Sequence, residues 1–420
     1  MKKFSKLIAL VLVLSLVFAF TACGKGGSDD TIKLGILCSL TGNSQTNGGY
    51  AQQGAKMAVE EINAAGGING KQIELVIEDD GGKADTAINA YNKLQSQKVV
   101  AIVGPMLSSL ALAMDQNVQT GKIPLLIGAT SAALTDNIDN PYFHRLRCSD
   151  TIMAEVAASY AVSNYGAKKI GIFYCSDDYG SGAMHTITKW CDANGVEYYE
   201  AGHNAGDKDL STQILKVKEE NCDVVIMWAH DDECALAARQ FYEQGLNLPV
   251  ISSTTIATPQ VYSLCNAEWI EGWNYVTDFI AENPSELVQT FSKNYDEKYG
   301  STPEIYAATY YNGVYAFADA AKRATSLESA DLCEALKTIN LDTLYGVYTA
   351  NDKRELAHTA IIGVMKNLVP SYQDQVTMDE APSPTRIRDR APIRSVPYHK
   401  EPFEPVPAAI RRTGPARRLS

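Results

Sequence analysis

Short apolar segments alternate with amphipathic segments along most of the chain, from about residue 32 to about residue 252. Segments such as Ile32–Leu40 and Val99–Val103 are continuously apolar, which predicts strands buried on both faces. Tyr50–Ala65 places its apolar residues at helical spacing, and Gly66 and Gly67 are expected to end that helix. Strands and helices that alternate in this way form parallel sheets with helices on both faces. The pattern therefore predicts an α/β fold.

The predicted strands are too many for one compact sheet, and 420 residues are enough for two domains with cores of their own. We therefore predict two doubly wound domains. Ligands of such sheets bind beyond the carboxyl ends of the strands. If the two domains face each other, these ends surround one cleft, which is a common location for a small-molecule site.

Residues 1–23 have the features of an export signal. Three lysines precede the apolar run Leu7–Phe20, which is too short for a comfortable membrane span. The run leads into Phe20-Thr21-Ala22-Cys23, which resembles the lipobox of bacterial lipoproteins and implies lipid attachment at Cys23. Residues 24–31 then form a flexible tether. We expect an extracytoplasmic protein held to the cell membrane by its lipid; an ordinary signal peptide with an incidental cysteine is the alternative.

The composition changes sharply near the end of the chain. Nine of the 16 prolines lie after residue 369, together with eight arginines, and the apolar periodicity stops there. Residues 367–420 are therefore predicted to be a disordered tail. The abrupt change is typical of a reading-frame shift or a foreign fusion. On this interpretation, truncation after Met365 costs little stability.

The net charge and the spacing of the cysteines argue against two classes of ligand, nucleic acid and metal ions. The net charge of −12 argues against nucleic acid, because affinity for phosphates comes mostly from lysine and arginine. Eight cysteines follow Cys23, and none has CxxC or CxxH spacing, so no metal site is predicted. Disulfides can form outside the cytoplasm, and buried free thiols are an equally good interpretation.

Small polar residues follow several predicted strands. Ser108 and Ser109 come after the third strand, and Thr130 comes after the fourth. Hydroxyls at the start of a helix can cap it, or can share its free N–H donors with a bound carboxylate. Tyr179 and His230 stand at strand ends in the second half, where simple turn and cap roles are the alternative. Because several such loops meet at one sheet edge, a binding site is predicted.

No catalytic motif accompanies these loops. The sequence lacks GxxxxGK[ST], a GxGxxG after the first strand, and a GxSxG elbow. None of the six histidines pairs with an evident serine or cysteine nucleophile. The sequence therefore predicts a binding protein without a cofactor, not an enzyme.

The chain resembles a known family from about Ile32 to Met365. The resemblance begins at IKLGILCSLTGNSQTNGGYAQQGAKMAVEEINAAGGINGKQIELVIEDD and continues in order through VVAIVGPMLSSLALAM, IPLLIGATSAALT and IGIFYCSDDYGSGA. These segments are similar to the leucine/isoleucine/valine-binding proteins, the type I solute-binding proteins of ABC importers. The resemblance implies two Rossmann-like lobes joined by three crossovers around a hinged cleft. It assigns residues 32–148 plus about 279–346 to lobe I, and residues 149–278 plus about 347–366 to lobe II.

Part of the family's ligand site carries over directly. Ser108 matches the serine that binds the ligand's α-carboxylate, and Ser109 adjoins it. Ala129 and Thr130 match the pair that contacts the carboxylate and the ammonium. Tyr179 matches a tyrosine of the second lobe.

Three positions depart from the family pattern. Asn47 replaces an aromatic residue, His230 replaces a second tyrosine, and Thr254 replaces the acidic residue that pairs with the ligand's ammonium. A buried ammonium without a negative partner is very costly. Either Asp231 or Asp232 therefore supplies the charge, or the ligand lacks a free α-ammonium.

The resemblance implies the substrate-binding component of an ABC importer. Its expected ligand is an amino acid of the branched-chain type or a related carboxylate-bearing solute, captured by hinge closure. The expected partners are this solute and the permease subunits in the membrane, with the lipid anchor holding the protein nearby. The alternative is a ligand-sensing module of the same fold that acts in signalling or regulation.

Overall fold

The computed structural model describes residues 31–136 and 138–377. The predicted signal segment with Cys23, residues 24–30 of the tether and residues 378–420 of the tail lie outside this part of the chain. Thr31, predicted as the end of the tether, begins the first strand. Within the described ranges, no helix has both the length and the apolar character needed to cross a membrane.

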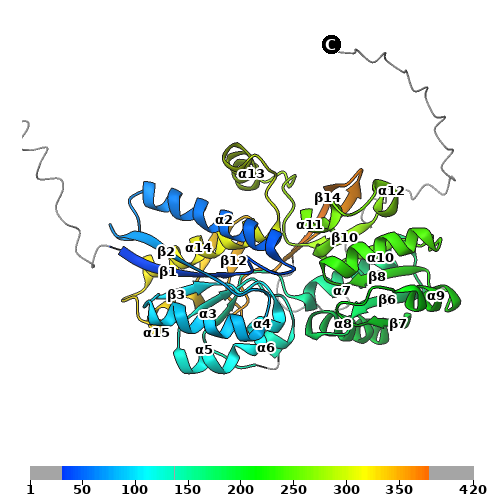
Figure 1. The fold of residues 1–420 in the computed structure, drawn as a ribbon, viewed down its shortest axis with the longest axis horizontal. Helices are drawn as coiled ribbons and strands as arrows, with labels where there is room; N and C mark the ends of the chain where they lie inside the picture. The colour runs from blue at the N-terminus through cyan, green and yellow to red at the C-terminus, as the bar shows by residue number, and fades with distance from the viewer. Residues whose placement is uncertain (1–30, 137, 378–420) are drawn as a thin grey trace, which may run out of the picture.

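The first lobe is built on a parallel five-stranded sheet with strand order β2-β1-β3-β4-β5 (Figure 1). β1 lies inside the sheet, pairing with β2 along its whole length and with β3 on its other side, which explains why its sequence is apolar from Leu34 onward. The strands are β1 (Thr31–Cys38), β2 (Gln72–Asp79), β3 (Ala101–Val103), β4 (Leu125–Ile127) and β5 (Phe143–Arg145).

Helices cover both faces of this sheet. Gly66 and Gly67 follow the first of them with φ angles of 102° and 76°, so the predicted glycine stop is confirmed. One face packs against α2 (Gln45–Ala64), α13 (Glu286–Tyr299), α14 (Ile305–Arg323) and α15 (Ser329–Lys337). The other face packs against α3 (Ala84–Ser96), α4 (Ser108–Ala113), α5 (Asp115–Gly121) and α6 (Ala133–Asp136).

The second lobe is built on a seven-stranded sheet with strand order β14-β13-β10-β9-β8-β6-β7. Five strands run parallel: β6 (Lys169–Cys175), β7 (Glu197–His203), β8 (Val224–Trp228), β9 (Val250–Ser252) and β10 (Asn274–Thr277). Two antiparallel strands extend the sheet beyond β10, namely β13 (Thr359–Lys366) and β14 (Val369–Thr377).

Helices also cover both faces of the second sheet. One face packs against α7 (Asp150–Tyr165) and α8 (Asp178–Asn194). The other face packs against α9 (Ser211–Glu219), α10 (Asp231–Glu243), η1 (Thr254–Ala257), α11 (Pro259–Tyr262) and α12 (Ala267–Ile270).

The chain passes between the two sheets three times, after β5, after β10 and before β13 (Figure 1). Buried ion pairs tie these crossings together. Arg147 of the first crossing pairs with Asp278 of the second, at 2.8 Å between Nη2 and Oδ1. Arg145 at the end of β5 pairs with Glu355 of the third crossing, at 3.4 Å.

Two segments near the end of the chain differ from the prediction. Of the segment 347–366 expected in lobe II, residues 359–366 form β13 of the second sheet, but residues 347–349 belong to β12 (Gly346–Thr349), which pairs with β11 (Asn340–Thr343) and buries Tyr348 in the first lobe's core. Residues 369–377, predicted to be tail, form β14. β14 is a half-buried edge strand held by backbone pairing to β13, so it carries no apolar run to reveal it.

The eight cysteines among the described residues are buried thiols, and none of them forms a disulfide. Burial raises the pKa of Cys191 to about 12, so its thiol stays protonated. These cysteines therefore act as small core residues.

Candidate functional site

A small cavity lies between the lobes at the carboxyl ends of their parallel strands. The loops after β3 and β4 line it from the first lobe, and the loops after β6, β8 and β9 line it from the second. The predicted residues that the structure brings together here are Ser108, Thr130, Tyr179, His230, Asp231 and Thr254. The rest of the lining consists of Met106, Leu107, Arg147, Met153, Ser253, Thr255 and Tyr306.

Ser108 and Thr130 supply hydroxyls from the first lobe. Ser108 is the first residue of α4, and its Oγ accepts a hydrogen bond from the backbone N–H of Ser131 at 3.2 Å. Thr130 lies in the next strand-end loop, and both side chains are buried. Their hydroxyl hydrogens can donate to an anionic group in the cavity.

Three other predicted residues do not line the small cavity. Ser109 is exposed. Ala129 is buried, and its carbonyl accepts a hydrogen bond from Arg145 at 2.9 Å. Asn47 lies next to the lining, where its Nδ2 donates to Oδ2 of Asp231 at 3.1 Å.

Glycines let the surrounding helices begin close to the strand ends. A Cβ on Gly48 would lie 1.8 Å from the carbonyl oxygen of Ser39, at the end of β1. A Cβ on Gly180 would lie 2.1 Å from the carbonyl oxygen of Cys175, at the end of β6. Any side chain at either position would push the helix, and with it Asn47 or Tyr179, away from the cleft.

Arg147 was missed by the analysis of the sequence. It lines the cavity, and three of its contacts to Asp278 are between 2.8 and 3.2 Å. The backbone N–H of Cys148 donates to the same carboxylate at 3.0 Å. Arginine is rare before residue 369, so the closely spaced Arg145 and Arg147 were the available signal.

Asp150 was also missed. It is 1% exposed, and neither carboxylate oxygen makes a hydrogen bond of regular geometry in the described part of the chain, although the side chains of Thr130 and Trp228 are close enough to favour its charged form. Its backbone N–H donates to the carbonyl of Thr130 at 2.9 Å, so it lies beside the predicted carboxylate site. Burial raises the pKa of Asp150 to about 6, although the nearby Arg145 and Arg147 partly oppose this. A buried acceptor pair of this kind suits a cationic ligand group.

Asp231 is the acidic residue that lines the small cavity itself. Burial raises its pKa to about 6, while His230, Asn47 and Thr258 favour the charged form. The hydroxyl of Thr258 donates to its Oδ1 at 3.3 Å.

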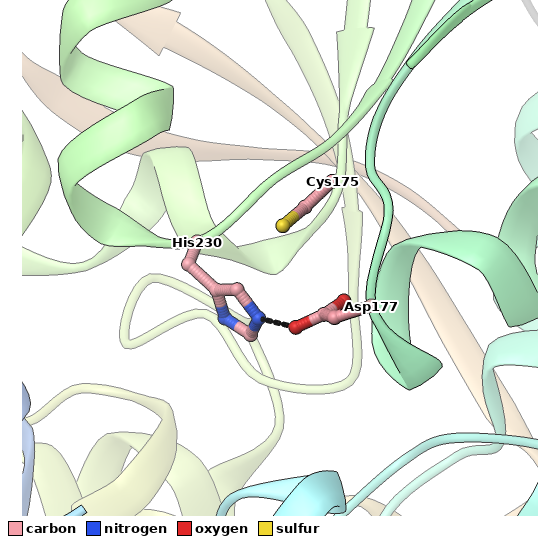
Figure 2. Close-up of side chains that lie close together, drawn as sticks. All are labelled: Cys175, Asp177 and His230. Atoms are coloured by element: carbon pink, nitrogen blue, oxygen red, sulfur yellow. Dashed lines mark hydrogen bonds and ion pairs between the residues drawn. The ribbon is translucent and has the colours of Figure 1, made fainter. Parts of the chain in front are cut away.

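His230 and Asp177 form the closest side-chain pair of this wall, at 2.5 Å between Nε2 and Oδ2 (Figure 2). Burial disfavours the charged imidazole, but the bond to Asp177 outweighs it, so the pKa of His230 lies above its usual value. The other oxygen of Asp177 accepts from the backbone N–H groups of Tyr179 and Gly180 and begins α8. The pair thus fixes two strand-end loops to each other.

Cys175 lies beside this pair (Figure 2). One ligand atom each from Cys175, Asp177 and His230 lies within 4.8 Å of the others, so these residues could hold a metal ion. Burial raises the pKa of the Cys175 thiol to about 12, and the nearby Asp177 adds to this, so metal binding would have to displace a firmly held proton. That no metal binds here stays a prediction.

The small cavity has a volume of about 40 Å³, which is comparable to the space that one water molecule occupies. Hydrogen bonds cross the cleft beside it, between Asn47 and Asp231 and between Ser131 Oγ and the Asp178 carbonyl at 3.2 Å. An amino acid is larger than this cavity, so it can enter only if the two lobes move apart.

The family model described as "Periplasmic binding protein" matches residues 31–367. The chain is 30% identical over 332 residues to "Leu/Ile/Val-binding protein homolog 1" of Brucella suis biovar 1, covering 78% of this chain and 86% of that one. It is also 30% identical over 262 residues to a "Leu/Ile/Val-binding protein" of Rhizobium johnstonii, covering 62% of this chain and 69% of that one.

Solved structures have the same fold. A leucine binding protein from Thermotoga maritima superposes with a TM-score of 0.78 at 23% identity, covering 83% of this chain and all of that one. A branched-chain amino acid transporter substrate binding protein from Streptococcus pneumoniae, solved with isoleucine, gives 0.75 at 26% identity with the same coverage. A solute binding protein of an ABC transporter from Rhodopseudomonas palustris, solved with 3,4-dihydroxybenzoic acid, gives 0.75 at 20% identity, covering 84% and 99%.

Proposed function

Because the chain belongs to the periplasmic binding protein family, we propose that it is the solute-binding component of an ABC importer and that its solute is an amino acid. The family consists of binding proteins, so the prediction that the chain is not an enzyme is confirmed. The predicted α/β fold of two lobes is confirmed by the solved structures as well.

The ligands named for the relatives share one chemical group. Isoleucine and 3,4-dihydroxybenzoic acid, bound by two of the similar proteins, both carry a carboxylate. The buried hydroxyls of Ser108 and Thr130 are suitable donors for such a group in this chain.

The observation that carries the amino-acid proposal is the buried carboxylate of Asp150, which lies beside Thr130 and makes no regular hydrogen bond in the described chain. An α-amino acid holds its ammonium two bonds from its carboxylate. A ligand whose carboxylate is bound by Ser108 and Thr130 therefore brings its ammonium close to Asp150. The ammonium supplies well-placed donors to oxygens that Thr130 and Trp228 approach without regular hydrogen-bond geometry, which reduces the cost of burying them. This arrangement makes an acidic residue at position 254 unnecessary.

The solute is then captured by a hinge motion that closes the two lobes around it. The open lobes admit the solute, and closure forms the bonds of Asn47 with Asp231 and of Ser131 with Asp178 across the cleft. The closed pair of lobes presents one combined surface to the permease. Lipid attachment at Cys23, which we also propose, would keep this surface near the membrane.

Calorimetric titration tests the proposal. The purified protein is titrated with neutral, acidic and basic amino acids and with aromatic acids that lack an ammonium. We expect binding of at least one amino acid, and we expect Asp150→Asn to weaken it at least about tenfold, the loss typical of a hydrogen bond to a charged group. Asp232→Asn is the matched control, because Asp232 is exposed and carries the same charge.

Two outcomes contradict the proposal. One is a folded protein that binds none of the amino acids. The other is an Asp150→Asn variant that binds the amino acid as tightly as the Asp232→Asn control. Binding of aromatic acids alone would show that the site takes a carboxylate without an ammonium.

A further inference from the structure

A group of buried acceptor atoms from both lobes lies at the cleft, and two of these atoms lack a donor in the described chain. Glu304 is 6% exposed, and its Oε1 accepts from the backbone N–H groups of Tyr306 and Ala307 at the start of α14, whereas its Oε2 has no partner in the described chain. Asn47 is 1% exposed, and its Oδ1 has no partner there either. Buried acceptors without a hydrogen bond are rare in folded proteins, so these two oxygens are suited to accept from a ligand.

Asp231 belongs to the same group. Its Oδ2 is bonded to Asn47, and its negative charge acts on Glu304. Arg147 is the cation that acts on Glu304, but its guanidinium is already bonded to Asp278. This part of the cleft thus combines two carboxylates and an amide oxygen, and the cations that act on them, Arg147 and His230, are already bonded to Asp278 and Asp177.

A larger cavity adjoins the small one, and Glu304 lines it. It has a volume of about 540 Å³ and shares Thr254 with the small cavity. Glu304 and Ile305 line it from the first lobe, and Tyr262 lines it from the second. The cleft region therefore has two adjoining cavities, the small one lined by Asp231 and the larger one lined by Glu304.

We propose that the solute is a basic amino acid, whose distal cation binds at Glu304, Asp231 and Asn47. The inference rests on the proposed function, because Ser108, Thr130 and Asp150 must already hold the α-groups. The distal ammonium or guanidinium supplies several N–H donors to the oxygens that lack them. Asn47 and Glu304 belong to the first lobe and Asp231 to the second, so the same cation holds the lobes together.

Binding of a basic amino acid should displace a proton from Glu304. Burial raises the pKa of Glu304 to about 8, while its N–H bonds and Arg147 favour ionisation and Asp231 opposes it. Below about pH 8 the free carboxyl holds a proton, which the distal cation must displace. Affinity for a basic amino acid therefore rises with pH up to about 8, because the ligand's own cation stays charged there. The other titratable groups near Glu304 are Tyr50, Tyr262, Tyr295 and Tyr306. Glu282, Lys293 and Asp296 line the same larger cavity, and Lys293 pairs with the exposed Glu297 at 3.8 Å.

The test compares ligands that differ in one charge. The full-length protein is titrated with lysine, arginine, leucine and Nε-acetyl-lysine, which keeps the length of lysine without its distal charge. We expect lysine or arginine to bind at least about tenfold more tightly than leucine and acetyl-lysine. Titration at pH 7 in buffers with different ionisation enthalpies should show release of close to one proton with the basic ligand.

The variant Glu304→Gln tests the residue. Its amide oxygen can still accept from the N–H groups that Oε1 now caps, so α14 keeps its start. We expect at least about a tenfold loss of affinity for the basic ligand and loss of the proton release, with affinity for neutral amino acids kept. Glu286→Gln is the control, an exposed glutamate near the start of α13.

Equal or tighter binding of leucine overturns this inference and leaves the proposed amino-acid function standing. So does a Glu304→Gln variant that binds lysine like the Glu286→Gln control. If the folded protein binds no amino acid of any class, the proposed function fails and the inference fails with it.

Discussion

The ion pair between Arg147 and Asp278 gives a direct test of how the two crossings are joined. The side chains are 4% and 0% exposed, and Asp278 also accepts the N–H of Cys148. Replacing Asp278 by alanine leaves a buried guanidinium and a backbone donor without their acceptor. Removing one partner of a buried pair costs about 3–5 kcal/mol. We expect a loss of this size in the free energy of unfolding, measured by urea denaturation without ligand.

The chain contains a matched exposed pair. Arg323 and Asp319 are 2.6 Å apart in α14, but their side chains are 35% and 25% exposed. Asp319→Ala should cost at most about 1 kcal/mol, because water replaces the lost contact. Replacing both Arg147 and Asp278 by apolar residues should destabilise less than Asp278→Ala alone, since no charge is then buried unpaired. A loss of less than about 1 kcal/mol for Asp278→Ala, or a loss equal to that of Asp319→Ala, would refute the reasoning.

Three further predictions concern the cleft and the end of the chain. Ser108→Ala should weaken ligand binding by about 10- to 100-fold in calorimetry, since it removes a hydrogen bond to a charged group. It should also lower the melting temperature of the free protein slightly, because the backbone N–H of Ser131 loses its acceptor. Asn47→Ala removes the bond to Asp231 across the cleft, worth about 1 kcal/mol, and should increase the radius of gyration of the ligand-free protein in X-ray scattering. Truncation after Lys366 removes β14 and exposes the edge of β13, so it should lower the melting temperature or cause aggregation. Truncation after Thr377 should do neither. Equal melting temperatures for the two truncated proteins would contradict the role of β14.

The alternation of apolar and amphipathic segments was enough to predict the architecture. β3, and β1 from Leu34 onward, are continuously apolar because strands on both sides and helices on both faces bury them. The positions of Ser108, Thr130, Tyr179 and His230 at strand ends also followed from the sequence, because a parallel sheet brings its carboxyl ends to one edge.

β14 and β12 show where the pattern fails. β14 is half-buried at a sheet edge and polar in sequence, so periodicity gave no sign of it. β12 was assigned to the wrong lobe because pairing partners far apart in the chain, and not local sequence, decide which core a short strand joins.

The sequence by itself determined the two α/β lobes and the polar loops that face the cleft, because these depend on periodicities within a few turns of helix or a single strand. Only the tertiary structure decided which charges are paired. Arg147 is 131 positions from Asp278, and it becomes a buried pair only when two crossings pack together. Asp150 and Glu304 look like ordinary helix-start carboxylates in the sequence. Their burial with carboxylate oxygens that lack a regular hydrogen bond, which gives them their chemistry, exists only once the lobes have packed around them.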